Sequence, residues 1–178
     1  MLSAILYFLI IRLALKRRKT KVQPEETITE FVIPEKALQP DFSNKEAWQE
    51  NNPYTQAGYV GQCTWFAWGR FYEIYGYSPE FTGDGKKLAE QLVKAHPESF
   101  ELSDTPKAGA VFSSVGKVHA GIVIRVEDGK ITIQEGNLDQ KTNSFAEAVK
   151  DWQEITLTIE EFTRHHGGVI YAVPKSGK

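Results

Sequence analysis

The chain has 178 residues, of which 41% are hydrophobic and 25% are charged, and its formal net charge is -2. This length suits one domain with appended segments, and the composition excludes a chain that is disordered throughout. The lack of an overall basic charge argues against nucleic-acid binding, so we expect no nucleic-acid partner. The single cysteine excludes an intramolecular disulfide.

Residues 1–21 differ in character from the rest of the chain. They run apolar from Leu2 to Leu15, interrupted by Ser3 and Arg12, and then turn basic. About 14 apolar residues fall short of the roughly 20 that cross a bilayer comfortably, and the charges follow the apolar run instead of preceding it as in a secretory signal. We expect an N-terminal hydrophobic helix that acts as a membrane anchor or binds a partner; an ordinary helix of the fold is the alternative.

A linker is predicted over residues 22–39, which contain two prolines, four glutamates and little apolar periodicity. The domain is therefore expected to span 40–178. Its first half reads as helical: a short helix before Pro53, a longer one beginning at Cys63, and another that begins near Gly83 or Asp84 and ends before Pro97.

The second half changes to the period of β-strands. Short β-branched runs at 108–114, 118–137 and 167–174 are separated by turn residues, and Asp128-Gly129 is a strong signal for a two-residue hairpin. Residues 144–152 are interpreted as a short helix or turn, and 158–168 as a connection. The predicted fold class is α+β, with N-terminal helices packed on a C-terminal antiparallel sheet.

Cys63 is placed to act as a nucleophile. The unpaired N–H groups and the dipole of a helix N-terminus favour a thiolate, and those N–H groups can also stabilise an oxyanion. Gly61 lets the backbone turn tightly just before the cysteine. A lone cysteine is more often a small buried hydrophobe, so its partners decide between the two interpretations.

A base for this thiol is expected from the predicted sheet. His119 opens a strand on the face opposite to the more apolar side chains, where a cleft can form. The hairpin at Asp128-Gly129 returns the chain so that Glu135 can reach His119, and Asn137 lies on the same face. Either acceptor would fix the tautomer of the imidazole. A strand-end histidine with a surface hydrogen bond is the alternative.

Two stretches carry a resemblance to a known family. GQCTWFAWGRF (61–71) resembles the signature of the cysteine, histidine-dependent amidohydrolase/peptidase (CHAP) family, in which a Gly-Gln-Cys-Thr run begins the central helix of a papain-like fold. Residues 107–137 resemble its second half, where a histidine opens one strand and a Glu-x-Asn element ends the next. The similarity covers roughly 54–173.

This resemblance implies that Cys63 is the nucleophile, His119 the base, Glu135 the residue that orients it, and Asn137 a fourth member of the site. It implies hydrolysis of a peptidoglycan amide bond, either as an N-acetylmuramoyl-L-alanine amidase or as a peptide endopeptidase, without a cofactor. Gln62, Tyr54, Tyr59 and Trp152 are candidates for substrate binding. Residues 51–62 contain no carboxylate, so no metal is expected there, and His165 and His166 are interpreted as a surface turn rather than a zinc site.

Two other functions stay open. The chain could cleave a small glutathionyl-type amide, or it could be a non-catalytic, membrane-tethered binding module. For the hydrolase, peptidoglycan is the expected partner, and residues 1–21 would attach it to a membrane, a virion or a secretion machine. The expected location is therefore membrane- or virion-associated, acting at the cell wall during local wall opening by a phage or conjugation machine, or during lysis.

Overall fold

The structure, a computed structural model, describes residues 30–176. The hydrophobic segment expected at 1–21 and the first part of the predicted linker lie outside these residues. Among the residues described, no helix has the length and apolar character needed to cross a membrane.

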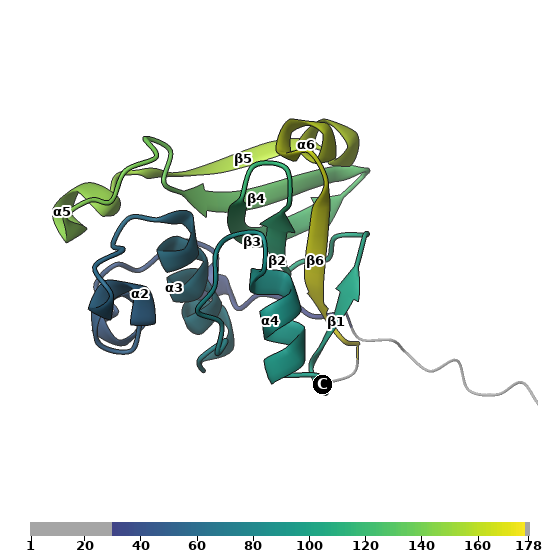
Figure 1. The fold of residues 1–178 in the computed structure, drawn as a ribbon. Coiled ribbons are helices and arrows are strands. Elements are labelled where there is room, and N and C mark those ends of the chain that lie inside the picture. Colours follow the sequence, from purple (N-terminus) through teal and green to yellow (C-terminus); the bar gives the residue numbers. More distant parts are fainter. Residues whose placement is uncertain (1–29, 177–178) are drawn as a thin grey trace, which may run out of the picture.

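Within residues 30–176, six antiparallel strands form one sheet in the order β1-β6-β2-β3-β4-β5 (Figure 1). The α+β prediction is confirmed. The strands are β1 (Phe100–Ser103), β2 (Val111–Ser114), β3 (His119–Glu127), β4 (Lys130–Gly136), β5 (Trp152–Thr158) and β6 (Val169–Pro174).

The turn between β3 and β4 is the two-residue hairpin that the sequence predicts. Glu127 pairs with Lys130, and the intervening Asp128 and Gly129 have φ values of 50° and 72°. Positive φ at both central residues matches the right-handed twist of the flanking strands. The hairpin fixes the register that carries β4 back alongside β3.

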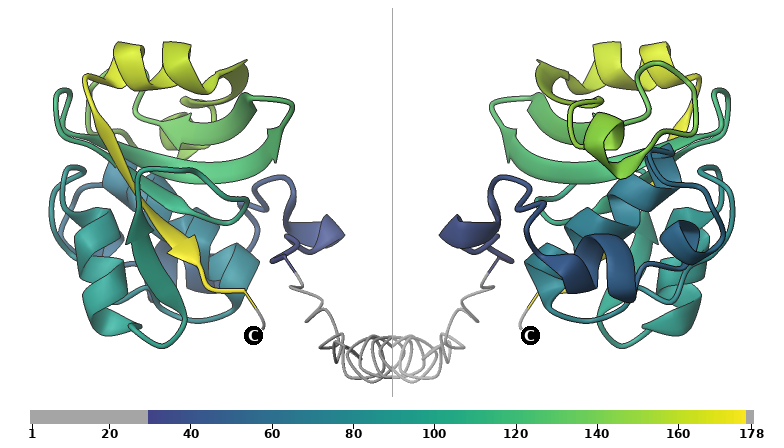
Figure 2. Two further views of the ribbon diagram at one scale, coloured as in Figure 1. Left: turned by 90° about the vertical axis from the view of Figure 1, so that its right-hand side faces the viewer. Right: turned by 90° about the vertical axis from the view of Figure 1, so that its left-hand side faces the viewer.

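Helices cover both faces of this sheet (Figures 1 and 2). Helices α3 and α4 lie on one side and α6 lies on the other. The helical segments are η1 (Glu35–Ala37), the π-helix η2 (Glu46–Glu50), α2 (Pro53–Gln56), α3 (Cys63–Tyr75), α4 (Leu88–Ala95), α5 (Phe145–Ala148) and α6 (Ile159–His166).

The long helix α3 packs its buried side against the sheet. Phe66, Ala67, Phe71 and Ile74 lie in the apolar core with Ala120 and Ile122 of β3 and with α4. Gly76, in the left-handed conformation with φ 76°, ends the helix. A second cluster on the other face of the sheet contains Phe112, Val123, Ile131, Ile133, Phe162 and Tyr171. The sheet is therefore buried on both faces over its central strands.

Residues 31–39, the last part of the predicted linker, pack against the domain. Ile33 is buried, and Phe31 stacks on Tyr75 with ring centroids 4.9 Å apart. The fully buried Arg70 donates to the carbonyl oxygen of Ala37 at 2.6 Å. These contacts fix the chain before Pro40 to α3.

Arg70 is paired as well as buried. It forms an ion pair with Glu73 and donates to Gln134 Oε1 at 2.8 Å. Trp48 Nε1 donates to Glu73 at 2.7 Å. A buried charge is tolerated only when it is paired and hydrogen-bonded, and this network meets that requirement.

Four elements differ from the sequence-based expectations. Strands β1 and β5 are absent from the prediction, and the expected connection at 158–168 is the helix α6. Its N-terminus has a capping box in which Thr158 and Glu161 bind each other's backbone N–H groups, and Gly167 ends it with φ 68°. Helix α4 also begins later than predicted, at Leu88.

Candidate active site

Cys63 occupies the first position of α3. Gly61, with φ 88°, makes the turn that precedes it, and a Cβ at Gly61 would lie 3.0 Å from Asn143 Cβ. Gln62 is extended and its side chain does not cap the helix. The first N–H groups of α3 are therefore not used by a side-chain cap, and they lie beside a free thiol that is 7% exposed.

His119 begins β3, as the sequence predicts, and its ring lies between Cys63 and Glu135. Its Nε2 is 2.9 Å from Glu135 Oε2. Because Nε2 is engaged, Nδ1 is the nitrogen left for Cys63. The predicted reach of Glu135 to His119 across the hairpin is therefore present in the geometry.

The backbone around His119 is tightly constrained. Val118, immediately before it, has φ 52°, an uncommon and strained conformation for a β-branched residue. A Cβ at Gly85 would lie 2.9 Å from the carbonyl carbon of His119. Such strain persists only where surrounding contacts fix the backbone.

The pKa of His119 is raised. Burial alone would lower it, but hydrogen bonds and charge interactions with Cys63 and Glu135 outweigh burial and raise the pKa to about 9. A histidine with this pKa is charged at neutral pH. The charged imidazole lies between the sulfur atom of Cys63 and the carboxylate of Glu135, which is the arrangement of groups that a cysteine hydrolase needs.

Glu135 is itself held in place by a residue that the sequence interpretation missed. Gln153 Nε2, on β5, donates to Glu135 Oε1 at 2.7 Å. Burial raises the pKa of the Glu135 carboxyl, but the bonds from His119 and Gln153 outweigh it and keep this pKa below its usual range. The carboxylate is thus charged and bound at both oxygens.

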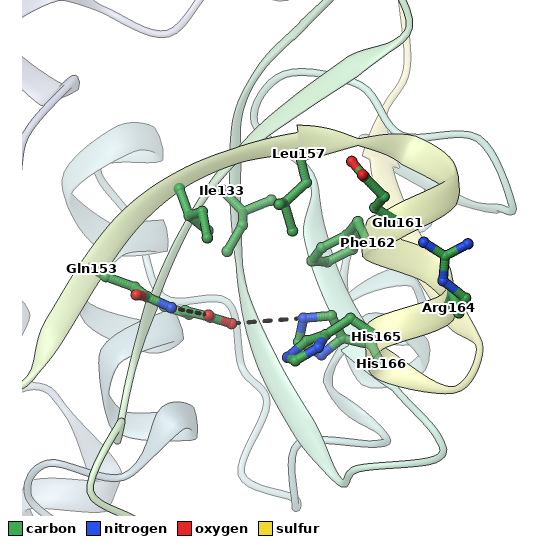
Figure 3. A pocket seen from close by; sticks show the side chains of 10 residues that line it. Ile133, Gln153, Leu157, Glu161, Phe162, Arg164, His165 and His166 are labelled. Atoms are coloured by element: carbon green, nitrogen blue, oxygen red, sulfur yellow. Dashed lines mark hydrogen bonds and ion pairs between the residues drawn. The ribbon is translucent and has the colours of Figure 1, made fainter.

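His166 is a second residue that the sequence interpretation misplaced. The predicted surface turn is wrong for it: His166 ends α6, is 4% exposed, and stacks on His119 with ring centroids 5.7 Å apart. Its Nε2 lies 3.9 Å from Glu135 Oε2 (Figure 3). The signal that could have found it is the capping box at Thr158, which starts a helix two turns earlier.

Asn137 is close to the site but does not bond His119. It follows β4 with φ 66°, and its Nδ2 donates to Gln62 Oε1 at 3.2 Å. Gln62 Nε2 in turn donates to Thr142 Oγ1 at 2.9 Å. The side chain of Asn137 therefore bonds Gln62, the residue before the cysteine. Of the two predicted acceptors, Glu135 and Asn137, Glu135 is the one that bonds the imidazole of His119.

Cys63 lies where two hollows meet. One, of about 360 Å³, is lined by Tyr54, Tyr59, Gln62, Cys63, Thr64, Thr82, Gly83, Asp84, Gly85 and Val118. The other, of about 550 Å³, contains Cys63, His119, Glu135, Asn137 and His166 in its wall. Three of the predicted substrate-binding residues thus lie beside the thiol. The fourth, Trp152, stacks on Phe66 with centroids 5.9 Å apart and lines neither hollow.

Residues 30–176 contain no group of three or more His, Cys, Asp or Glu side chains arranged to hold a metal ion. The reactive side chains of the described site are the thiol of Cys63, the imidazole of His119 and the carboxylate of Glu135.

Comparison with known sequences identifies the family to which the chain belongs. A sequence model of the CHAP domain matches residues 39–137, more than half of the chain. The chain belongs to the CHAP domain family. The match begins before η2 and ends at Asn137, so it includes Cys63, His119 and Glu135. Strands β5 and β6 and helix α6, which hold Gln153 and His166, lie beyond the matched part of this CHAP domain.

Solved structures show a weaker likeness. They include an N-acetylmuramoyl-L-alanine amidase from Staphylococcus aureus (TM-score 0.43, 23% identity, covering 65% of this chain and 31% of that one). Ly7917 aligns with TM-score 0.44 and 16% identity over 79% of this chain and 61% of its own. Ly7917 with the hydrolysing product of MDP aligns with TM-score 0.43 and 15% identity over 65% and 54%. The chain thus spans about a third to three fifths of these structures, and no curated protein matches it.

Proposed function

We propose that this CHAP domain is a cysteine-dependent hydrolase that cuts an amide bond of peptidoglycan. The observation that carries the proposal is the His119 ring, which is bound to Glu135 through Nε2 and interacts with Cys63 at the start of α3. A nucleophile, a base and a residue that orients the base are thereby aligned, as acyl transfer through a thiol requires. Membership of the CHAP family supports the choice of peptidoglycan.

In the proposed reaction, the Cys63 thiolate attacks the carbonyl carbon of the amide. The oxygen takes up the negative charge beside the first N–H groups of α3, which are oriented before the reaction begins. When the intermediate collapses, the carbon–nitrogen bond breaks and the His119 imidazolium gives its proton to the leaving amine. The product of this half-reaction is a thioester on Cys63 and a free amine.

Water completes the cycle. His119, now neutral, takes a proton from a water molecule that attacks the thioester carbonyl. The carbon–sulfur bond breaks, which releases a carboxylic acid and restores the thiolate and the imidazolium. Glu135 remains charged throughout and stabilises the imidazolium form, while Gln153 holds the carboxylate in place.

Digestion of purified cell walls tests the proposal. Wild-type full-length chain, Cys63→Ala and His119→Gln are incubated with Gram-positive and Gram-negative peptidoglycan, and released fragments are identified by mass spectrometry. His96→Gln is a matched control because His96 lies at the end of α4, where its Nε2 is 3.1 Å from the carbonyl oxygen of Ser78.

We expect new amino termini from wild type and His96→Gln only. New amino-terminal L-alanine on the stem peptide identifies an amidase, and a terminus within the peptide identifies an endopeptidase. Folded wild-type protein that releases nothing from either wall, and that binds the wall equally well as Cys63→Ala, would contradict hydrolysis and favour a binding module.

A further inference from the structure

A third hollow extends the site beyond Glu135, away from Cys63. It has a volume of about 620 Å³ and lies between β4, β5 and α6; we call it the α6 arm (Figure 3). Its lining residues are Ile133, Glu135, Gln153, Ile155, Leu157, Glu161, Phe162, Arg164, His165 and His166. Four of these, Glu135, Gln153, His165 and His166, also line the hollow that contains Cys63 and His119. The α6 arm therefore adjoins the reacting groups directly.

Two buried polar atoms in the wall of the hollow around His119 have no partner. Among the residues described, the side-chain atoms that are buried without a hydrogen bond are Asn137 Oδ1, His166 Nδ1 and Tyr171 Oη. Asn137 and His166 both line the hollow around His119. Buried polar atoms are nearly always paired, and an unpaired one costs about 1–3 kcal/mol. A ligand that bonds both atoms would recover this free energy.

Both atoms are hydrogen-bond acceptors. Asn137 uses its amide nitrogen to donate to Gln62, so its free atom is the carbonyl oxygen. The pKa of His166 is lowered to about 4 by burial, so its ring is neutral at neutral pH. The carboxylate of Glu135, 3.9 Å from Nε2, favours the proton on that nitrogen, which leaves Nδ1 as an acceptor. The ligand must therefore bring hydrogen-bond donors.

The apolar lining of the α6 arm comes from the half-buried Ile155 and Leu157, with the fully buried Ile133 and Phe162 beneath them. Such a surface fits the side chains of a peptide. An exposed aromatic ring, which suits the flat face of a sugar, lies in the hollow on the opposite side of Cys63, where Tyr59 is 55% exposed. Peptide N–H groups would supply the donors that Asn137 and His166 lack.

Charge favours the same occupant. Both carboxylates that line the α6 arm are engaged inside the protein, Glu135 by His119 and Gln153, and Glu161 by the backbone and side chain of Thr158. Arg164 at the rim makes only an exposed contact with Glu160 at 3.5 Å. The charge available to a ligand there is positive, which suits a peptide carboxylate.

We propose that the α6 arm binds the stem peptide of peptidoglycan. Peptide N–H groups bond Asn137 Oδ1 and His166 Nδ1, an aliphatic side chain lies over Ile155 and Leu157, and a carboxylate pairs with Arg164. The glycan then lies on the other side of Cys63, at Tyr54 and Tyr59. This inference rests on the proposed hydrolase function and adds to it the direction in which the substrate lies.

Binding to an inactive chain tests the inference separately from hydrolysis. Full-length Cys63→Ala is titrated with a synthetic stem pentapeptide, with the same peptide carrying an amidated C-terminus, and with a chitooligosaccharide, and the dissociation constants are measured by calorimetry. Arg164→Gln and Leu157→Trp are introduced in the α6 arm. Arg125→Gln is the matched control, a cation on β3 that lines a different hollow.

We expect Arg164→Gln and Leu157→Trp to weaken pentapeptide binding fivefold or more, and Arg125→Gln to leave it unchanged. Amidation of the peptide should weaken binding to the parent chain but not to Arg164→Gln. A further variant, Tyr59→Ala, should be the only one that weakens binding of the oligosaccharide.

The inference is overturned if Arg164→Gln and Leu157→Trp both bind the pentapeptide as tightly as the parent chain. It is also overturned if these two variants lose binding of the oligosaccharide instead of the pentapeptide. If the wild-type chain still digests cell walls in that case, the hydrolase proposal stands and only the placement of the peptide fails. Because Arg164 is exposed, Arg164→Gln tests the inference even if Leu157→Trp does not fold.

Discussion

The rings of His119 and His166 lie almost parallel, with 9° between their planes, and the Nε2 atoms of both face the same oxygen of Glu135. Their charges differ nonetheless. Contact with Cys63 and Glu135 raises the pKa of His119 to about 9, whereas burial lowers the pKa of His166 to about 4. At neutral pH one stacked ring is charged and the other is neutral, so Glu135 has a single cationic partner.

The two shifts predict opposite slopes of stability with pH. The pKa of His119 is higher in the folded chain than its ordinary value of 6.5, so its contribution is complete below pH 6.5 and is lost as pH rises through 9. The pKa of His166 is lower in the folded chain, so its cost is absent above pH 6.5 and grows as pH falls toward 4. We expect urea unfolding to show greatest stability near pH 6.5.

A variant separates the two histidines. His166→Phe keeps an aromatic ring against Phe162 and removes the titrating group. It should reduce the acid-side loss by roughly 2 kcal/mol and leave the alkaline slope unchanged. An acid slope equal to that of wild type would show that another group, such as the Glu135 carboxyl with its lowered pKa, governs the loss of stability at acid pH.

Gln153→Met should lower kcat by roughly 10- to 100-fold with little effect on KM. The substitution removes the hydrogen bond to Glu135 Oε1, and bonds to charged groups contribute about 1.5–3 kcal/mol. Steady-state kinetics on soluble muropeptides measures the effect. The control is Thr156→Val on the same strand, which removes a hydrogen bond of 2.8 Å between the hydroxyl groups of Thr156 and Thr132. This bond lies away from the site, so the kcat of the control should stay near that of wild type. Equal losses in both variants would indicate a general effect on β5.

Gly61→Ala should impair catalysis more than Gly58→Ala. Both glycines have positive φ, 88° and 80°, so alanine is strained at each. A Cβ at Gly58 meets nothing within 4 Å, whereas one at Gly61 meets Asn143 at 3.0 Å. The added contact displaces the turn before Cys63, and kcat should fall roughly tenfold to a hundredfold. Similar unfolding midpoints with unequal kcat values would support this explanation; equal kcat values would contradict it.

Arg70→Met should destabilise the domain by about 3–5 kcal/mol in denaturant unfolding, because it leaves the buried Glu73 without its cation. The double change Arg70→Met with Glu73→Leu should cost less than the two single changes added together. Arg164→Gln, which removes an exposed pair, should cost under about 1 kcal/mol. A double variant that costs as much as the sum would show that the two charges do not depend on each other.

The sequence predicts the part of this site that local signals describe. Gly61 and Cys63 mark the start of a helix, and Asp128-Gly129 fixes the register that brings Glu135 to His119. These are short-range rules of turns and caps, and the residues that obey them are found where expected.

The rest depends on long-range packing. Strand β5, which supplies Gln153, alternates half-buried and exposed residues and has no turn signal of the hairpin type before it. His166 was misplaced because its neighbours Gly167 and Gly168 read as a turn, although Thr158 and Glu161 mark a helix start. The segment before Pro40 has the polar composition of a linker. It packs against α3 because the buried Arg70 donates hydrogen bonds to the carbonyl oxygens of Ala37 and Gln39. Each of these contacts joins residues distant in sequence.

The position of β6 has a consequence for the synthesis of the chain. This strand, Val169–Pro174, is among the last parts of the described chain, yet it lies inside the sheet between β1 and β2. While the ribosome still holds those residues, β1 has no partner strand and α6 has no continuation into the sheet. The nascent thiol and histidine are therefore translated well before the fold that supports them can close, which delays the active arrangement until β6 has been made.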